Sequence, residues 1–250
     1  MTAPAPRVEA RWSSRSDRSG ITLALKLLVG ICLVAPATPA AAQAGVSISL
    51  LSDYRFRGYS YSQGRPIAAI NFSYDRADGL YMGLSASGVL TRSDGVSLLG
   101  LQENVGFAKR LKSGLTVDAG FTNANYTRYS NGVRAFGYAE VYVGLLGKHV
   151  ASHVYFSPNY ITSGTRSIYA EVDGVVRPAP HWRFNWHVGG QALRSERRHR
   201  NQFDWRIGLT REIGSTDVQL AVSRGERRVP AQSERRPDRT AVVVAVTHAF

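Results

Sequence analysis

The chain has 250 residues, a formal net charge of +13 and one cysteine. This length fits one large all-β domain, so a division into two domains is not required. The basic excess would suit a nucleic-acid partner, but the sequence contains no zinc-ligand spacing, RNA-binding signature, Walker loop, G-x-S-x-G or H-E-x-x-H motif. We therefore predict no nucleic-acid partner, no cofactor, no metal site and no catalytic residue.

Residues 1–43 are typical of a secretory signal peptide that is cleaved after export. Basic residues precede and enter an apolar run, and two overlapping A-x-A cleavage patterns lie within 40–44. A membrane-anchoring helix is the alternative, but the run is short and Lys26 interrupts it. Export would remove Cys32 with the leader, so the mature domain, residues 44–250, is expected to lack disulfides.

Beyond residue 45, apolar and polar residues alternate with period two in segments of about ten to fourteen residues, separated by turn signals. Tight turns alternate with longer, more polar connections, as in outer-membrane barrels. We predict a transmembrane antiparallel up-and-down β-barrel of about twelve strands, with about ten to fourteen allowed. A soluble β-sandwich is the alternative. The expected strands cover residues 46–58, 66–76, 80–91, 97–109, 115–127, 134–147, 150–161, 166–177, 181–193, 202–212, 216–224 and 239–250.

The first expected strand, 46–58, ends in the run Ser-Asp-Tyr-Arg-Phe-Arg-Gly. Because side chains alternate along a strand, Asp53, Arg55 and Arg57 share one face. Guanidinium groups facing lipid are costly, so this face is expected to line the lumen, where Asp53 can pair with Arg55. The charges could form a structural ion pair or part of a solute site, and the sequence leaves both open.

The central strands separate an apolar face from a polar one. Over 202–212, Phe203 and Trp205 alternate with Asp204 and Arg206. Aromatic side chains suit contact with lipid, so the opposite face is expected to line the lumen. This alternation assigns ten residues to the pore lining, and their balanced charge predicts weak ion selectivity. They are Asp53, Arg55, Arg57, Arg134, Glu140, Glu171, Asp173, Arg183, Asp204 and Arg206.

One residue conflicts with this assignment. Glu103 shares its strand face with Leu101, Val105 and Phe107, which would place a carboxylate against lipid. We expect a β-bulge or a register shift near Gly100 to resolve the conflict.

The connection over 224–239 is rich in arginine. On the external side, its guanidinium groups could form bidentate hydrogen bonds with lipopolysaccharide phosphates. A solvated loop is the alternative, because the segment also contains prolines. The residues expected to contact the outer leaflet are Arg227, Arg228, Arg235 and Arg236.

The last expected strand, 239–250, ends on an aromatic residue, Phe250. Phe250 and Val246 share the apolar face, and the strand is expected to close the barrel against 46–58. A terminal phenylalanine resembles the insertion signal of bacterial outer-membrane barrels. We therefore assign Phe250 as an assembly signal for the barrel-assembly machinery.

Ser52–Gly58 resembles the opening strand of a proteobacterial family of porins, the TorF family. Further similarity lies in 137–144, 155–160 and 168–171, and in the terminal Phe250. The resemblance implies a single-chain outer-membrane β-barrel with passive solute passage.

The expected function is a porin-like barrel in the outer membrane of a Gram-negative bacterium, allowing passive diffusion of small hydrophilic solutes or ions. Its expected surroundings are outer-membrane lipid and lipopolysaccharide. Two alternatives share the fold: a structural or adhesive barrel that does not conduct, and an outer-membrane enzyme. The sequence indicates neither the solute nor the oligomeric state.

Overall fold

A computed structural model describes residues 42–130, 134–196, 198–227 and 240–250 of the chain. The predicted leader therefore lies outside the described residues, except for Ala42 and Gln43, which begin the first strand. Among the described residues, no helix has the length and hydropathy needed to span a membrane.

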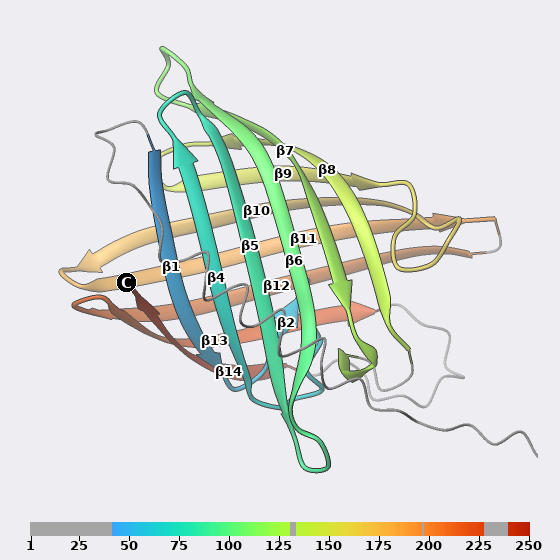
Figure 1. The fold of residues 1–250 in the computed structure, drawn as a ribbon. Coiled ribbons are helices and arrows are strands. Elements are labelled where there is room, and N and C mark those ends of the chain that lie inside the picture. Colours follow the sequence, from blue (N-terminus) through green and yellow to red (C-terminus); the bar gives the residue numbers. More distant parts are fainter. Residues whose placement is uncertain (1–41, 131–133, 197, 228–239) are drawn as a thin grey trace, which may run out of the picture. The chain divides into compact units, whose positions relative to one another are not determined.

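Within the described residues, twelve strands form a closed antiparallel barrel, which confirms the predicted fold class (Figure 1). Each barrel strand pairs with the next along the chain, and β1 closes the barrel by pairing with β14. The barrel strands are β1 (Ala42–Leu51), β4 (Ile67–Arg76), β5 (Leu80–Thr91), β6 (Gly95–Arg110), β7 (Thr116–Tyr126), β8 (Phe136–Leu146), β9 (Val150–Ser157), β10 (Arg166–Ala179), β11 (Trp182–Ser195), β12 (Arg198–Ile213), β13 (Thr216–Arg227) and β14 (Ala241–Ala249).

The two faces of the barrel wall differ in chemistry as predicted. Along β12, the outward Phe203 and Leu209 are 57% and 42% exposed, whereas the inward Asp204 and Thr210 are 6% and 2% exposed. A soluble β protein buries its apolar face, so an apolar outer wall around a polar interior is the arrangement of a membrane barrel.

The first strand ends earlier than predicted. Strand β1 stops at Leu51, and residues 52–66 fold into the barrel with a short hairpin of β2 (Arg55–Phe56) and β3 (Tyr59–Ser60). The prediction of one strand through residue 58 was therefore wrong beyond Leu51. The hairpin reverses at Arg57 and Gly58, whose φ angles of 49° and 76° are incompatible with a continuing strand. We call residues 52–66 the inward segment.

A bulge occurs in β6, but it does not turn Glu103 inward. The pairing of β5 with β6 shifts between Ser87 and Gly88, which leaves Leu99 as an extra residue. Leu99 is fully buried beside the exposed Leu98, and normal alternation resumes beyond it. Glu103 remains on the outer wall, so the bulge does not resolve the predicted conflict.

The seam of the barrel joins the two ends of the domain. Ser47 pairs with Ala249 and Leu51 pairs with Ala245, and the Phe250 amide donates to the Val46 carbonyl at 3.0 Å. The predicted closure between the first and last strands is therefore confirmed. The charged run that follows Leu51 takes no part in this strand pairing, because it belongs to the inward segment.

The arginine-rich connection lies mostly outside the described residues. Arg228, Arg235 and Arg236 fall within the undescribed range 228–239. Arg227 ends β13, and only its backbone is described. Their expected contact with the outer leaflet stays a prediction.

Candidate functional site

The inward segment is held in shape by the carboxylate of Asp53. Its Oδ1 atom accepts hydrogen bonds from Ser60 Oγ at 2.5 Å, Ser62 Oγ at 2.9 Å and the Gly64 amide at 3.3 Å. Its Oδ2 atom pairs with Arg55 at 3.2 Å, as the sequence predicted. The Asp53 side chain thus binds residues on both arms of the hairpin. These local hydrogen bonds replace strand pairing, so β1 ends at Leu51.

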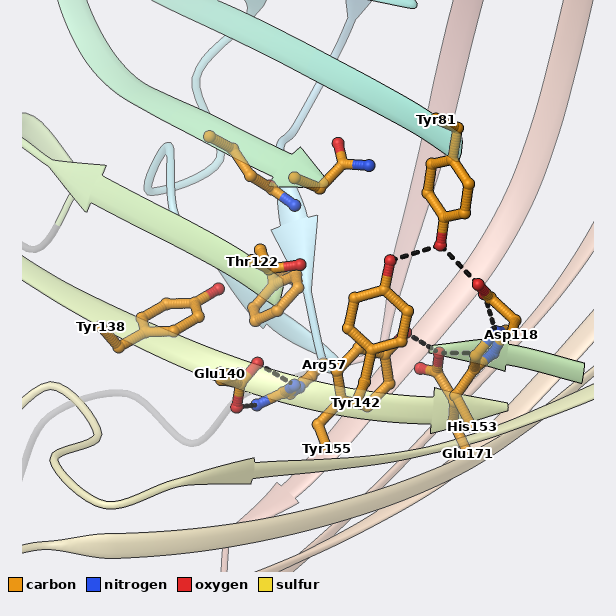
Figure 2. Close-up of a pocket in the computed structure, with 13 residues that line it drawn as sticks. Arg57, Tyr81, Asp118, Thr122, Tyr138, Glu140, Tyr142, His153, Tyr155 and Glu171 are labelled. Atoms are coloured by element: carbon orange, nitrogen blue, oxygen red, sulfur yellow. Dashed lines mark hydrogen bonds and ion pairs between the residues drawn. The ribbon is translucent and has the colours of Figure 1, made fainter. Parts of the chain in front are cut away.

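Arg57 ties the inward segment to the barrel wall. Its two terminal nitrogens donate to the carboxylate of Glu140 on β8, at 2.9 Å and 2.7 Å (Figure 2). The two side chains are only 5% and 2% exposed. The guanidinium carbon also lies 4.0 Å from the ring centroid of Tyr169 on β10. A bidentate, buried pair with an aromatic face beneath it fixes the segment in direction as well as in position.

A close backbone contact fixes the same segment against another strand. A Cβ atom on Gly58 would lie 2.5 Å from the Cα atom of Gly225 on β13. A Cβ atom on Gly225 would lie 2.9 Å from the Gly58 carbonyl oxygen. Because both positions lack a side chain, the segment can touch the wall directly. It therefore contacts strands β8 and β13, which are far apart around the barrel.

Aromatic rings pack around the inward segment where β7 ends and β8 begins. Tyr61 meets Tyr126 edge to face with 4.8 Å between ring centroids, and Phe136 lies 5.6 Å from Tyr61. Tyr138 and Tyr160 are also 4.8 Å apart. This cluster narrows the lumen toward the end that carries the longer connections.

Two cavities lie along the inward segment, each of about 330 Å³. Phe56 of the segment and Glu171 of β10 line both cavities. The first, which we call the β7–β9 cavity, is bordered by Tyr81, Asp118, Glu140, Tyr142, His153 and Tyr155, among others. The second, the β12–β14 cavity, is bordered by Asp53, Arg55, Asp173, His187, Asp204 and Arg206, among others.

Tyrosines and carboxylates are linked by hydrogen bonds in the β7–β9 cavity (Figure 2). The Tyr81 hydroxyl donates to Asp118 at 2.6 Å and lies 2.5 Å from the Tyr142 hydroxyl. Asp118 also lies 3.3 Å from His153 Nε2. The wall of this cavity is therefore polar, and its carboxylate groups outnumber its guanidinium groups, which favours cations and hydrogen-bond donors.

His187 lies between two carboxylates in the β12–β14 cavity. Its Nδ1 atom is 2.9 Å from Asp173, and its Nε2 atom is 2.9 Å from Asp204. Glu171, Asp173 and His187 place potential ligand atoms within 4.8 Å of one another. Both ring nitrogens of His187 contact carboxylates, and this group borders the lumen. The expected absence of a metal site stays a prediction.

Eight of the ten side chains predicted to line the pore border the two cavities. Arg134 and Arg183 do not: Arg134 is exposed just before β8, and Arg183 binds Glu212 and Asp217 near the opposite end of the barrel. The prediction also omitted Asp118, although its alternation with the outward Val117 and Phe121 gave the signal. The role of these residues in solute passage stays a prediction.

Residues 35–245 match a protein family described as "Bacterial protein of unknown function (Gcw_chp)". No curated protein sequence matches the chain significantly. Among solved structures, a protein titled "KdgM porin" is 9% identical with a TM-score of 0.52, over 82% of this chain and 99% of that one. A NanC porin is 11% identical with a TM-score of 0.50, over 84% and 99%. Identities this low support the barrel fold alone.

Proposed function

Because the chain belongs to the Gcw_chp family, whose description assigns no activity, we propose its function from its own geometry. It is an outer-membrane barrel through which small hydrophilic solutes or ions diffuse passively, with the inward segment as the constriction. The observation that carries this proposal is the pair of charged cavities along a segment that reaches across the lumen. The resemblance of Ser52–Gly58 to TorF porins points the same way.

The interior chemistry supports water and solute in the lumen. A barrel that serves only as a scaffold can fill its interior with apolar side chains, as small barrels often do. Here the cavities are lined by carboxylates, guanidinium groups, tyrosines and histidines. Burying such groups without water is costly unless every one is paired. A hydrated lumen avoids that cost.

The charges at the cavities favour cations. Six carboxylates border them, from Asp53, Asp118, Glu140, Glu171, Asp173 and Asp204, against the three guanidinium groups of Arg55, Arg57 and Arg206. Carboxylate groups therefore outnumber guanidinium groups by three in the lining. The sequence predicted weak selectivity because the ten predicted residues had equal numbers of acidic and basic groups, including Arg134 and Arg183. These two arginines do not border the cavities, so we expect a preference for cations.

Planar-bilayer recording of the purified protein tests this function. We expect small, reproducible current steps and a reversal potential on the cation side under a potassium chloride gradient. Replacing Asp118 and Asp173 with Asn should reduce the cation preference, because both carboxylates border the cavities. Asp78→Asn is the matched control, since Asp78 is an exposed turn residue that pairs with Arg76.

A non-conducting structural barrel is the second candidate. The buried Arg57–Glu140 pair and the aromatic cluster favour it, because both hold the inward segment across the lumen. The same recordings separate the two functions. The absence of current steps at every voltage would support the structural barrel, and an anion preference would contradict the proposed cation-selective lining.

The location and partners belong to the same proposal. The apolar outer wall supports insertion into the outer membrane, after export by the predicted leader within residues 1–43 and folding by the barrel-assembly machinery. The arginines of the 224–239 connection would then contact lipopolysaccharide phosphates.

A further inference from the structure

A single carboxylate lies at mid-height on the outer wall, away from the lumen. Glu103 is exposed near the middle of β6, which runs from Gly95 to Arg110. Its outward neighbours on the strand, Leu101 and Val105, are 36% and 42% exposed and apolar. On the rest of the described outer wall, ionisable side chains occur near strand ends, as Arg76, Arg211 and Arg224 do.

The position of Glu103 is unfavourable for an isolated barrel in a bilayer. A carboxylate at this height would face hydrocarbon, which provides no hydrogen-bond donor. Among the described residues one neighbour supports it: Asn123 Nδ2 on β7 donates to Glu103 Oε2 at 3.2 Å. Within the described part of the chain, the Glu103 Oε1 atom and the second amide hydrogen of Asn123 have no hydrogen-bond partner and can bind another molecule.

The outer wall of β7 and β8 beside Glu103 is flat, so another protein surface can approach it closely. Asn125 follows Asn123 on the same face of β7. A Cβ atom on Gly137 of β8 would lie 2.5 Å from Asn125 Oδ1, so the Asn125 side chain lies over the backbone of β8. Ala139 is the next outward residue on β8, opposite Asn123. The wall is therefore flat and polar here, with an apolar border of Leu101, Val105, Phe121 and Val141.

We propose that this patch, Glu103 with Asn123 and Asn125, binds a second copy of the same chain. The patch presents an acceptor beside a donor, so it is complementary to itself under a twofold rotation. Each Asn123 amide donates one hydrogen to its own Glu103 and one to the Glu103 of the partner. The four groups then form a closed ring, and the apolar border excludes lipid. Lipid tails have no donor that could replace this ring.

Cysteine cross-linking in native membranes tests the proposal. The chain has one cysteine, Cys32, so a Cys32→Ser background makes every cross-link specific. Asn125→Cys should give a covalent dimer with an oxidant or a short bis-maleimide. Leu220→Cys is the matched control, because Leu220 is 55% exposed on the outer wall of β13. Absent cross-linking at Asn125, or equal cross-linking at both sites, would overturn the proposal.

A second variant tests the polar ring itself. Glu103→Leu places an apolar residue on an apolar wall, so the barrel should still fold and insert. The cross-linked dimer in the Asn125→Cys background should fall about tenfold, which corresponds to about 1.4 kcal/mol. Val244→Leu should leave the yield unchanged, because Val244 is an exposed apolar residue of β14, outside the patch and its border. An undiminished dimer in Glu103→Leu would show that the carboxylate does not hold the interface.

Discussion

Arg57 and Glu140 are both charged and almost completely buried, and each neutralises the charge of the other. Their two hydrogen bonds satisfy the carboxylate and both terminal nitrogens of the guanidinium group. Removing one partner would leave a charge in a place where water has little access. The pair therefore matters most through the cost of breaking it.

Glu140→Ala should lower the free energy of unfolding by about 3–5 kcal/mol, because Arg57 would remain buried and unpaired. Urea titration of the protein folded into lipid vesicles measures the change. Asp78→Ala is the control: its pair with Arg76 is exposed, and its loss should cost less than about 1 kcal/mol. The double variant Arg57→Met, Glu140→Leu should recover much of the stability. Equal effects of Glu140→Ala and Asp78→Ala would contradict this account.

The sequence predicted which side of the barrel wall a residue faces, but not which residue it contacts. Alternation with outward apolar residues placed Glu140 and Asp204 inside from the sequence alone, because period two is a local property. The contact of Arg57 with Glu140 spans 83 positions and depends on how the inward segment folds. No local pattern contains that information. For this reason the sequence indicated charges in the lumen without indicating which of them neutralise each other.

The inward segment is the element for which the sequence was misleading. Its polar and aromatic residues alternate from Asp53 to Arg57, which is the pattern of a strand. The chain instead follows the hydrogen bonds that Asp53 accepts from Ser60 and Ser62. In β6 the sequence predicted an irregularity near Gly100, but only the pairing of the strands shows that Glu103 still points outward. Side-chain hydrogen bonds and register decide such cases, and both are long-range.

Gly225→Ala should displace the inward segment, because its methyl group would meet the Gly58 carbonyl group at about 3 Å. We expect a larger single-channel conductance, since the segment narrows the lumen, and a lower free energy of unfolding by about 1–3 kcal/mol. Planar-bilayer recording and urea titration measure the two effects.

Gly190→Ala is the matched control, because a Cβ atom there meets only the Phe203 ring at ordinary contact distance. Its conductance should equal that of the unmodified protein. An unchanged conductance in Gly225→Ala would show that the inward segment does not limit the current.

At the scale of the whole molecule, the sequence was sufficient for the architecture. The number of strands, their order and the closure between the ends follow from alternating segments and turn signals, which recur around the entire barrel. Errors at single boundaries do not change the closed fold, because each strand is fixed by pairing on both sides. What fills the lumen, in contrast, depends on the inward segment, residues 52–66, which turns away from the barrel wall after β1.

Phe250→Ala should reduce the amount of folded barrel in the outer membrane severalfold, while the barrel refolded in detergent keeps its free energy of unfolding within about 0.5 kcal/mol. The ring is 77% exposed and packs on His248, with 4.8 Å between centroids, so it adds little to stability. The heat-modifiable band in membrane fractions and urea titration in detergent measure the two quantities. Equal losses in both would assign Phe250 a packing role instead of an assembly role.

The seam between β1 and β14 also sets an order of events. Ser49 and Thr247 meet across it through hydroxyl groups 2.9 Å apart, although 198 positions separate them in the chain. Strands that are neighbours in the chain can pair as soon as both have been synthesised. The outer edge of β1 stays unpaired until β14 is present. An unfinished chain therefore exposes two sheet edges that can pair with any other strand. The pairing of β14 with β1 is the step that removes both open edges, and with them this route to aggregation.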